Sequence, residues 1–230
     1  MPAPRPIVPK NSRKCRILIV DDHPLLREGL RGVINRVPGM VVCGEAENAS
    51  QAMNAVQKLA PDLALVDITL PGKSGLELVK DLKVTHPQLA ILAISMHDES
   101  LYAERVLRAG ANGYITKQQP PEELIKAIRQ VHDKHIYVSK QVSENLLRRI
   151  SLHSAEDASP VSLLTDREFE IMRLLGAGKA PREISRQLHL SPKTIAVHTS
   201  NVRRKLNLKT TAKLIRFAVQ LEEMRNPTQD

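Results

Sequence analysis

The stretch RILIVDDHPLLREGL, residues 16–30, passes from apolar to acidic at a single point. The strand expected at residues 16–20 is apolar from Ile17 onward, and Asp21 and Asp22 follow it directly. A run that is apolar throughout, rather than at alternate residues, is typical of a parallel sheet covered by helices on both faces. The stretch therefore predicts a buried parallel strand with two carboxylates at its carboxyl end.

Short apolar runs and helical segments alternate along the following hundred or so residues. Further apolar runs occur at residues 40–45, 63–66, 90–94 and 113–116, and segments with apolar residues at three- and four-residue spacing separate them. Strands that alternate with helices form βαβ units. Residues 15–134 therefore predict an α/β fold with a five-stranded, doubly wound parallel sheet.

The pattern changes after residue 134. Residues 135–160 contain one short helical segment and then a stretch rich in Ser, Ala and acids, which predicts an exposed linker. In residues 161–225 every periodic segment is helical. Thr165 precedes one helix with capping-box spacing, and Ser191 before a proline marks the start of another. We expect a second, small all-α domain.

The charge of the chain is concentrated in this second half. The formal net charge is +9, and residues 179–216 contain ten basic residues and a single acid, Glu183. Such an excess is typical of a surface that binds a polyanion. Aromatic residues make up only 2% of the chain, which argues against a stacking platform for single-stranded nucleic acid.

Other features of the composition indicate a cytoplasmic protein. Cys15 and Cys43 lack the spacing of metal ligands and predict reduced, buried side chains. His23 likewise has no partner at metal-binding spacing, and we expect it to be a packing residue. The first 14 residues, rich in proline and base, predict a flexible leader. No apolar run approaches the roughly 18 residues of a membrane span, so no membrane contact is expected.

Polar side chains follow four of the predicted strands. Asp21 and Asp22 follow the first, Asp67 the third, Ser95 the fourth and Lys117 the fifth. Ligands bind outside the carboxyl ends of parallel strands, and the first and third strands are neighbours in a doubly wound sheet. Three carboxylates would repel one another without a cation, so they predict a Mg²⁺ site. The Ser95 hydroxyl and the Lys117 ammonium could bind an oxygen of a phosphoryl group at the same edge.

Two simpler interpretations remain open at this point. Asp22 could cap the helix that begins near Pro24, and Asp67 could cap a turn before Pro71. Each explains one residue, but neither explains why three carboxylates gather at one edge of the sheet.

The combined pattern resembles a known family. The Asp pair, Asp67 with LPGKSG shortly after it, Ser95, and Tyr114 three residues before Lys117 resemble the receiver domain of two-component response regulators, over residues 15–134. The resemblance implies a flavodoxin-like fold in which Asp67 accepts a phosphoryl group from a histidine kinase.

The same resemblance assigns roles to the remaining residues. It implies that Asp21, Asp22, Asp67 and the backbone carbonyl of Thr69 hold Mg²⁺. It also implies that Ser95 and Lys117 grip the phosphate and that Tyr114 is a switch residue. Leu70 and Gln118 depart from the family, which commonly has Met and Pro at these positions.

The segment APREISRQLHLSPKTIAVHTSNVRRKL, residues 180–206, predicts a helix, a short turn and a second helix. On the second helix, Ile195, Val202 and Leu206 share a packing face, and the opposite face is free to enter the major groove of DNA. The candidate DNA contacts are Lys193, Thr194, Ala196, Val197, Ser200, Arg203, Arg204 and Lys205.

Residues 161–221 resemble the helix-turn-helix domain of LuxR-type transcriptional regulators. The resemblance rests on LTDREFEIMRLL, REIS and SPKTIAVHTSNVRRKL. It implies sequence-selective binding of duplex DNA, commonly as a homodimer through the last helix, here residues 211–221. Ala196 and Thr199 stand where the family often has Lys and Arg.

The interpretation that fits both halves is a transcription factor controlled by phosphorylation. One alternative is a phosphatase with an aspartyl nucleophile, but its D-x-D motif requires a second acid where this chain has Thr69. Another is an architectural DNA-binding protein whose receiver has lost its function, and its DNA affinity would ignore Mg²⁺ and phosphoryl donors.

Overall fold

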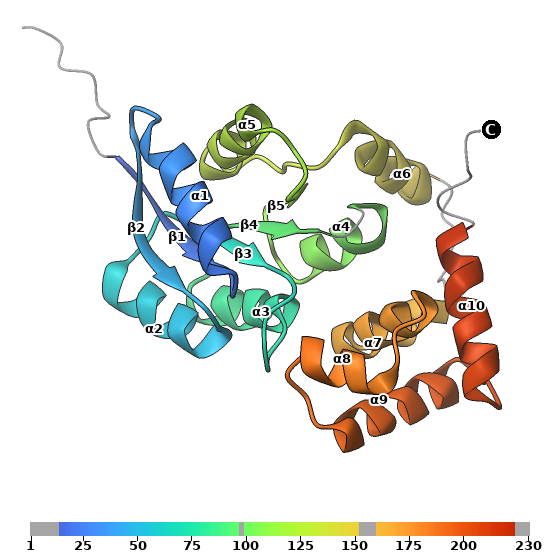
Figure 1. The fold of residues 1–230 in the computed structure, drawn as a ribbon. Helices are drawn as coiled ribbons and strands as arrows, with labels where there is room; N and C mark the ends of the chain where they lie inside the picture. Colours follow the sequence, from blue (N-terminus) through green and yellow to red (C-terminus); the bar gives the residue numbers. More distant parts are fainter. Residues whose placement is uncertain (1–13, 97–98, 152–159, 224–230) are drawn as a thin grey trace, which may run out of the picture.

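The five apolar runs form the five strands of one parallel sheet (Figure 1). The computed structural model describes residues 14–96, 99–151 and 160–223. The sheet has the strand order β2-β1-β3-β4-β5, which confirms the predicted doubly wound fold. The strands are β1 Cys15–Val20, β2 Met40–Ala46, β3 Leu63–Asp67, β4 Ala90–Ser95 and β5 Gly113–Thr116.

Five helices cover the two faces of the sheet. They are α1 Pro24–Asn35, α2 Ala49–Leu59, α3 Gly75–Thr85, α4 Glu99–Arg108 and α5 Pro121–His132. Alternate residues of β1 face opposite sides, because Ile17 packs with α1 and α5 while Leu18 packs with α2, α3 and α4. The central strands β1, β3 and β4 are therefore buried on both faces, which explains their largely apolar sequences, whereas the edge strand β2 is mostly half-buried.

The segment after α5 runs beside the edge strand β5. The backbone N–H of Tyr114 donates to the carbonyl of Tyr137 at 2.9 Å, and the N–H of Tyr137 donates to the carbonyl of Asn112 at 3.0 Å. The next helix, α6 Lys140–Ser151, buries Val142 in the core. Part of the predicted linker is thus fixed to the α/β unit.

The carboxyl-terminal unit is entirely helical in its described residues, 160–223. Its elements are η2 Pro160–Leu163, α7 Asp166–Gly176, α8 Pro181–Gln187, α9 Pro192–Lys205 and α10 Thr211–Glu223. Thr165 and Glu168 form the predicted capping box, and the Ser191 side chain accepts from the N–H of Thr194. Both helix starts are therefore where the sequence predicts them.

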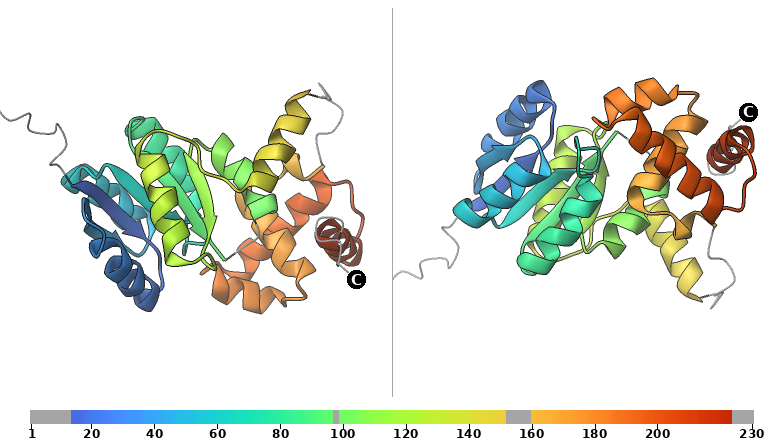
Figure 2. Two further views of the ribbon diagram at one scale, coloured as in Figure 1. Left: turned by 90° about the horizontal axis from the view of Figure 1, so that it is seen from above. Right: turned by 90° about the horizontal axis from the view of Figure 1, so that it is seen from below.

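The helical unit packs against α3, α4 and the loop between β3 and α3, away from β2 and α2 (Figures 1 and 2). Asp166, at the start of α7, accepts from Lys80 at 2.8 Å and from Arg105 at 3.2 Å. The Arg105 guanidinium also lies 4.2 Å from the centre of the Phe169 ring, which meets Tyr102 edge to face. One side of α7 is thus covered by the α/β unit and the other by α9 and α10.

Some predictions concern segments outside this description. The predicted leader, residues 1–14, lies outside the described residues except for its last residue. The acid-rich part of the linker, residues 152–159, also lies outside them. Within the described ranges, no helix is both long enough and apolar enough to cross a membrane.

Candidate functional site

The predicted polar residues lie at one edge of the sheet. Asp67 is the last residue of β3 and Ser95 the last of β4, while Asp21 and Lys117 directly follow β1 and β5. These four strands are neighbours and run parallel, so their carboxyl ends meet. The fold therefore brings together side chains from positions almost a hundred residues apart.

Lys117 joins two carboxylates at the centre of this edge. Its Nζ lies 2.6 Å from Asp21 Oδ2 and 2.7 Å from Asp67 Oδ2, and all three side chains are almost completely buried. Burial raises the pKa of Asp67 to about 6; the Asp21 charge adds to this rise, and Lys117 opposes it. Burial also acts to lower the pKa of Lys117, but the two carboxylates outweigh it and raise that pKa.

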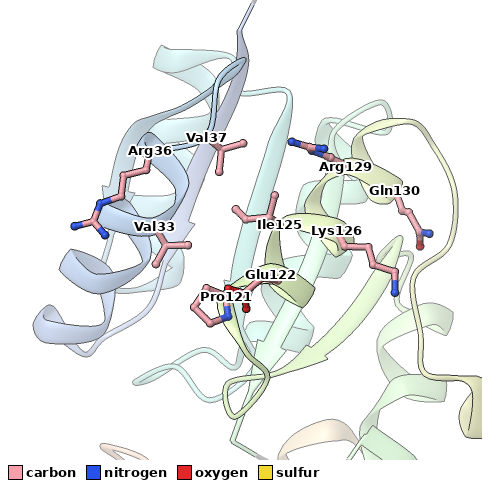
Figure 3. Close-up of a pocket in the computed structure, with 9 residues that line it drawn as sticks. All are labelled: Val33, Arg36, Val37, Pro121, Glu122, Ile125, Lys126, Arg129 and Gln130. Atoms are coloured by element: carbon pink, nitrogen blue, oxygen red, sulfur yellow. The ribbon is translucent and has the colours of Figure 1, made fainter.

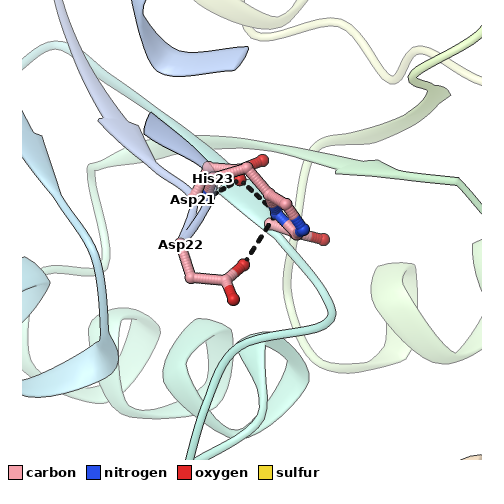
Figure 4. Close-up of side chains that lie close together, drawn as sticks. Asp21, Asp22 and His23 are labelled. Carbon is pink, nitrogen blue, oxygen red and sulfur yellow. Dashed lines mark hydrogen bonds and ion pairs between the residues drawn. The ribbon is translucent and has the colours of Figure 1, made fainter. Parts of the chain in front are cut away.

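Asp22 and His23 lie beside Asp21 (Figure 4). With Asp21 and Asp67 they make up a group that we call the acidic cluster. The Nδ1 atom of His23 lies 3.0 Å from Asp21 Oδ1 and 2.9 Å from Asp22 Oδ1. The N-cap of α1 is His23, whose side chain makes no capping hydrogen bond to the helix, so the interpretation of Asp22 as a helix cap is wrong. The contacts of His23 were not predicted from the sequence, although its position directly after two carboxylates was a usable signal.

The donor set suits a hard divalent cation. One ligand atom each from Asp21, Asp22, His23 and Asp67 lies within 4.8 Å of the others, and three of these residues supply carboxylate oxygens. Two of the carboxylates are buried and share the single ammonium of Lys117, so the three like charges still repel one another and would be stabilised by a further cation. Carboxylate oxygens with room for water and phosphate oxygens are the surroundings that Mg²⁺ prefers.

The loop after Asp67 keeps the backbone close to this carboxylate. The N–H of Thr69 donates to Asp67 Oδ1 at 2.9 Å, so the turn that Asp67 could cap does form beside the acidic cluster. A Cβ atom on Gly75 would lie 1.9 Å from the Asp67 carbonyl oxygen, which explains the glycine there. The role of the Thr69 carbonyl as a metal ligand stays a prediction.

Ser95 and Tyr114 are both completely buried at this side of the sheet. The carbonyl of Ser95 accepts from the N–H of Lys117 at 2.7 Å, which fixes the two candidate phosphate-binding residues relative to each other. Tyr114 lies in the same core as α4. Its movement on phosphorylation stays a prediction.

The second candidate site is the outer face of α9. The exposed members of the predicted set are Lys193, Ala196, Val197, Ser200 and Arg204. The half-buried members are Thr194, Arg203 and Lys205. Lys205 Nζ lies 2.6 Å from Glu168 Oε2 of α7, so it also ties α9 to α7. The opposite face packs as expected, with Ile195 and Val202 buried.

A separate cavity of about 680 Å³ lies between α1 and α5 (Figure 3). It contains none of the residues of the acidic cluster. Its lining combines apolar side chains with basic ones: Val33, Arg36, Val37, Pro121, Glu122, Ile125, Lys126, Arg129 and Gln130.

Known proteins match both halves of the chain. The family of response regulator receiver domains matches residues 17–129, and the LuxR family of bacterial regulatory proteins matches residues 162–218. The transcriptional regulatory protein DegU of Brevibacillus brevis is 32% identical, over 86% of this chain and 90% of that protein. The nitrate/nitrite response regulator NarL of Escherichia coli (strain K12) is 33% identical, over 87% and 93%.

Solved structures show the same two-part architecture. RcsB from Salmonella enterica serovar Typhimurium, bound to promoter rprA in the presence of the phosphomimetic BeF₃⁻, has 27% identity and a TM-score of 0.61. That match covers 90% of this chain and 99% of the RcsB chain. Another structure contains two RcsB dimers bound to two parallel DNAs, with 27% identity, a TM-score of 0.56 and coverage of 89% and 98%.

Proposed function

The chain belongs to the DNA-binding response regulators of two-component systems that combine a receiver domain with a LuxR-type helix-turn-helix, and we propose that Asp67 is its phosphoacceptor. The family consists of transcription regulators and not of catalytic enzymes, which excludes the phosphatase alternative. The observation that carries the proposal is the position of Asp67, buried at the end of a central strand with Lys117 Nζ 2.7 Å away.

The surroundings of Asp67 suit transfer of a phosphoryl group. An oxygen of Asp67 would form a bond to phosphorus while the bond from phosphorus to the donor, the phosphohistidine of a histidine kinase, breaks. Such transfer depends mainly on positioning and on neutralising charge at the phosphoryl oxygens. Lys117 would supply one positive charge and Ser95 a hydroxyl donor. Asp21, Asp22, Asp67 and the Thr69 carbonyl would hold Mg²⁺, which would supply further positive charge when bound.

Labelling with a small acyl phosphate tests this assignment. Acetyl phosphate carrying radioactive phosphorus should label the wild-type protein in the presence of Mg²⁺, and Asp67→Asn should abolish the label because the nucleophilic oxygen is lost. Asp81→Asn is the control, because Asp81 is a half-exposed carboxylate on α3 that pairs with Lys73. Undiminished labelling of the Asp67→Asn protein would contradict the proposal.

We further propose that the outer face of α9 reads duplex DNA in the cytoplasm. Its exposed members include two basic residues and Val197, whose 53% exposure suits contact with a thymine methyl group. Arg204→Ala should weaken operator binding and reduce the slope of log affinity against log salt by about one, because one phosphate contact is lost. Arg108→Ala on α4 is the exposed control. An unchanged slope for Arg204→Ala would count against this orientation of α9.

We also propose that two copies pair through α10, residues 211–221. Leu214 and Ala218 pack inside the helical unit, which leaves Ile215, with 36% exposure, and the half-buried Val219 toward the outside. Sedimentation of the phosphorylated protein should show a dimer that Ile215→Glu disrupts. A dimer that survives this substitution would point to another surface.

Phosphorylation would act on the contact between the two units. The outer face of α9 is exposed while α7 is docked, so release of the units would not be needed to uncover it. Arg167 of α7 donates to the carbonyl of Gly72, in the loop that follows Asp67. We propose that a phosphoryl group on Asp67 shifts this loop and thereby the position of α7. DNA affinity that ignores both Mg²⁺ and acetyl phosphate would instead support a receiver without function.

A further inference from the structure

Arg27 is an arginine on the buried face of α1. It shares this face with Leu30 and Ile34, and only 7% of its surface is exposed. A buried guanidinium destabilises a fold unless its N–H groups find acceptors and its charge is neutralised. Arg27 is visible in the sequence only as a charged residue at an apolar position of an amphipathic helix.

The guanidinium reaches three acceptors in two segments. Its Nη1 donates to the backbone carbonyl of Asp21 at 2.6 Å. Its Nε donates to Glu45 Oε2 at 3.2 Å, and its Nη2 donates to Glu47 Oε1 at 2.8 Å. The planar group therefore connects the carboxyl end of β2 to the first residue after β1.

These contacts fix the backbone of Asp21 from both sides. Its N–H donates to the carbonyl of Ala46 at 3.0 Å, and its carbonyl accepts from Arg27. That carbonyl belongs to the peptide group that leads into Asp22, so its orientation determines the direction in which Asp22 leaves the sheet. The positions of two of the three carboxylates in the acidic cluster thus depend on where Arg27 holds one oxygen atom.

We propose that Arg27 is a positioning residue for the metal site of this receiver. The inference rests on the proposed function, because it assumes that Asp21, Asp22 and Asp67 bind Mg²⁺. Arg27 acts through the geometry of the backbone and not through net charge, because Glu45 and Glu47 neutralise it. Lysine would keep the charge but could not reach three acceptors with a planar fork. Arg27→Lys should therefore disturb the site.

Calorimetric titration of the unphosphorylated full chain with Mg²⁺ tests the proposal. Arg27→Lys should weaken Mg²⁺ binding by about tenfold, as removal of an outer-shell partner of a metal site typically does. Arg31→Lys is the matched control, because Arg31 lies one turn further along α1, pairs with the same Glu45 at 3.2 Å and is half exposed. The control should bind Mg²⁺ as the wild type does. Equal affinities of the two variants would overturn the proposal.

Phosphorylation kinetics separate positioning from a merely structural role. With acetyl phosphate, the Mg²⁺ concentration for half-maximal labelling should rise by the same factor in Arg27→Lys, while the rate at saturating Mg²⁺ stays close to that of the wild type. A lower rate at saturating Mg²⁺ with unchanged affinity would instead indicate a structural role and overturn the proposal. Glu47→Gln, which weakens one of the three contacts, should shift Mg²⁺ affinity in the same direction by a smaller factor. This variant decides the question if Arg27→Lys does not fold.

Measurements on the wild-type protein distinguish failure of the proposed function from failure of the proposed role of Arg27. If it neither binds Mg²⁺ nor accepts phosphate, the proposed function fails and the role of Arg27 fails with it. If it does both and Arg27→Lys behaves as Arg31→Lys does, the role of Arg27 alone is wrong.

Discussion

At the scale of single residues, Glu170 links the two units electrostatically. This carboxyl lies on α7, is buried at the contact between the units, and pairs with Arg167 at 2.6 Å. Burial raises its pKa to about 7, Arg167 opposes this rise, and the charges of Asp67 and Glu77 add to it. A residue of the DNA-binding unit is therefore sensitive to the charge at the proposed phosphoacceptor.

Glu170 should make stability depend on pH. Its pKa in the folded protein exceeds the ordinary value of 4.5, so its contribution to stability is fully present below pH 4.5 and is lost as pH rises through about 7. Glu170→Gln should therefore unfold less readily than the wild type at pH 8, by about 1 to 2 kcal/mol, and the difference should shrink at pH 5.

Denaturant unfolding at the two pH values measures this difference. Glu144→Gln is the control, because Glu144 is exposed on α6. A gain for Glu170→Gln that is the same at pH 5 and pH 8 would show that titration of Glu170 is not its cause.

The sequence predicted the convergence of Asp21, Asp22, Asp67, Ser95 and Lys117, because strand ends in a parallel sheet leave little freedom. The local contacts were harder to foresee. The spacing of residues in the sequence does not predict whether Asp22 caps a helix or which groups Arg27 binds. Both depend on the positions of side chains in the folded protein.

At the scale of elements, the strands were predictable and the edge pairing was not. The central strands β1, β3 and β4 are buried on both faces, so their composition alone identifies them, whereas the edge strand β2 is mostly half-buried. Residues 135–139 looked like part of a linker, yet Tyr137 pairs with the edge of β5. This pairing consists of a single bridge between distant parts of the chain, which leaves no periodic pattern in the sequence.

Gly113 should be essential for that pairing. A Cβ at this position would lie 2.7 Å from the Tyr137 carbonyl oxygen and 3.1 Å from a methyl group of Val131. Gly113→Ala should therefore separate the segment from β5 and speed hydrogen exchange at the amides of Tyr114 and Tyr137.

Gly32→Ala provides the matched control for this change. A Cβ there would meet nothing within 4 Å, and alanine in a helix interior should add roughly 0.5 to 1 kcal/mol of stability. Unchanged exchange at Tyr114 and Tyr137 in Gly113→Ala would show that β5 and the segment tolerate the methyl group.

At the scale of the whole molecule, the docking of the two units was invisible in the sequence. Asp166, Phe169 and Glu170 look like ordinary residues of an amphipathic helix, and nothing local indicates that α7 is covered on both sides. The contact depends on Lys80 of α3 and Arg105 of α4, which pair with Asp166 from a distant part of the chain.

Asp166→Asn should loosen the docked arrangement. The substitution removes the charge that Lys80 and Arg105 share in a largely buried position, which should cost about 1 to 3 kcal/mol. X-ray scattering should then show a larger radius of gyration in the unphosphorylated protein. Asp81→Asn, which removes the half-exposed partner of Lys73, is the control. Equal radii for both variants and the wild type would mean that other contacts suffice for docking.

The pairing of Tyr137 with β5 also bears on how the chain can be divided. An uncovered edge strand presents free N–H and C=O groups that recruit strands from other molecules. A fragment that ends at residue 134 would expose the edge of β5 to solvent, whereas one that continues through Ser139 would keep the segment around Tyr137 paired with that edge. Residues 135–139 therefore protect the sheet against aggregation, and a fragment cut at residue 134, the boundary that the sequence pattern predicts, would lose that protection.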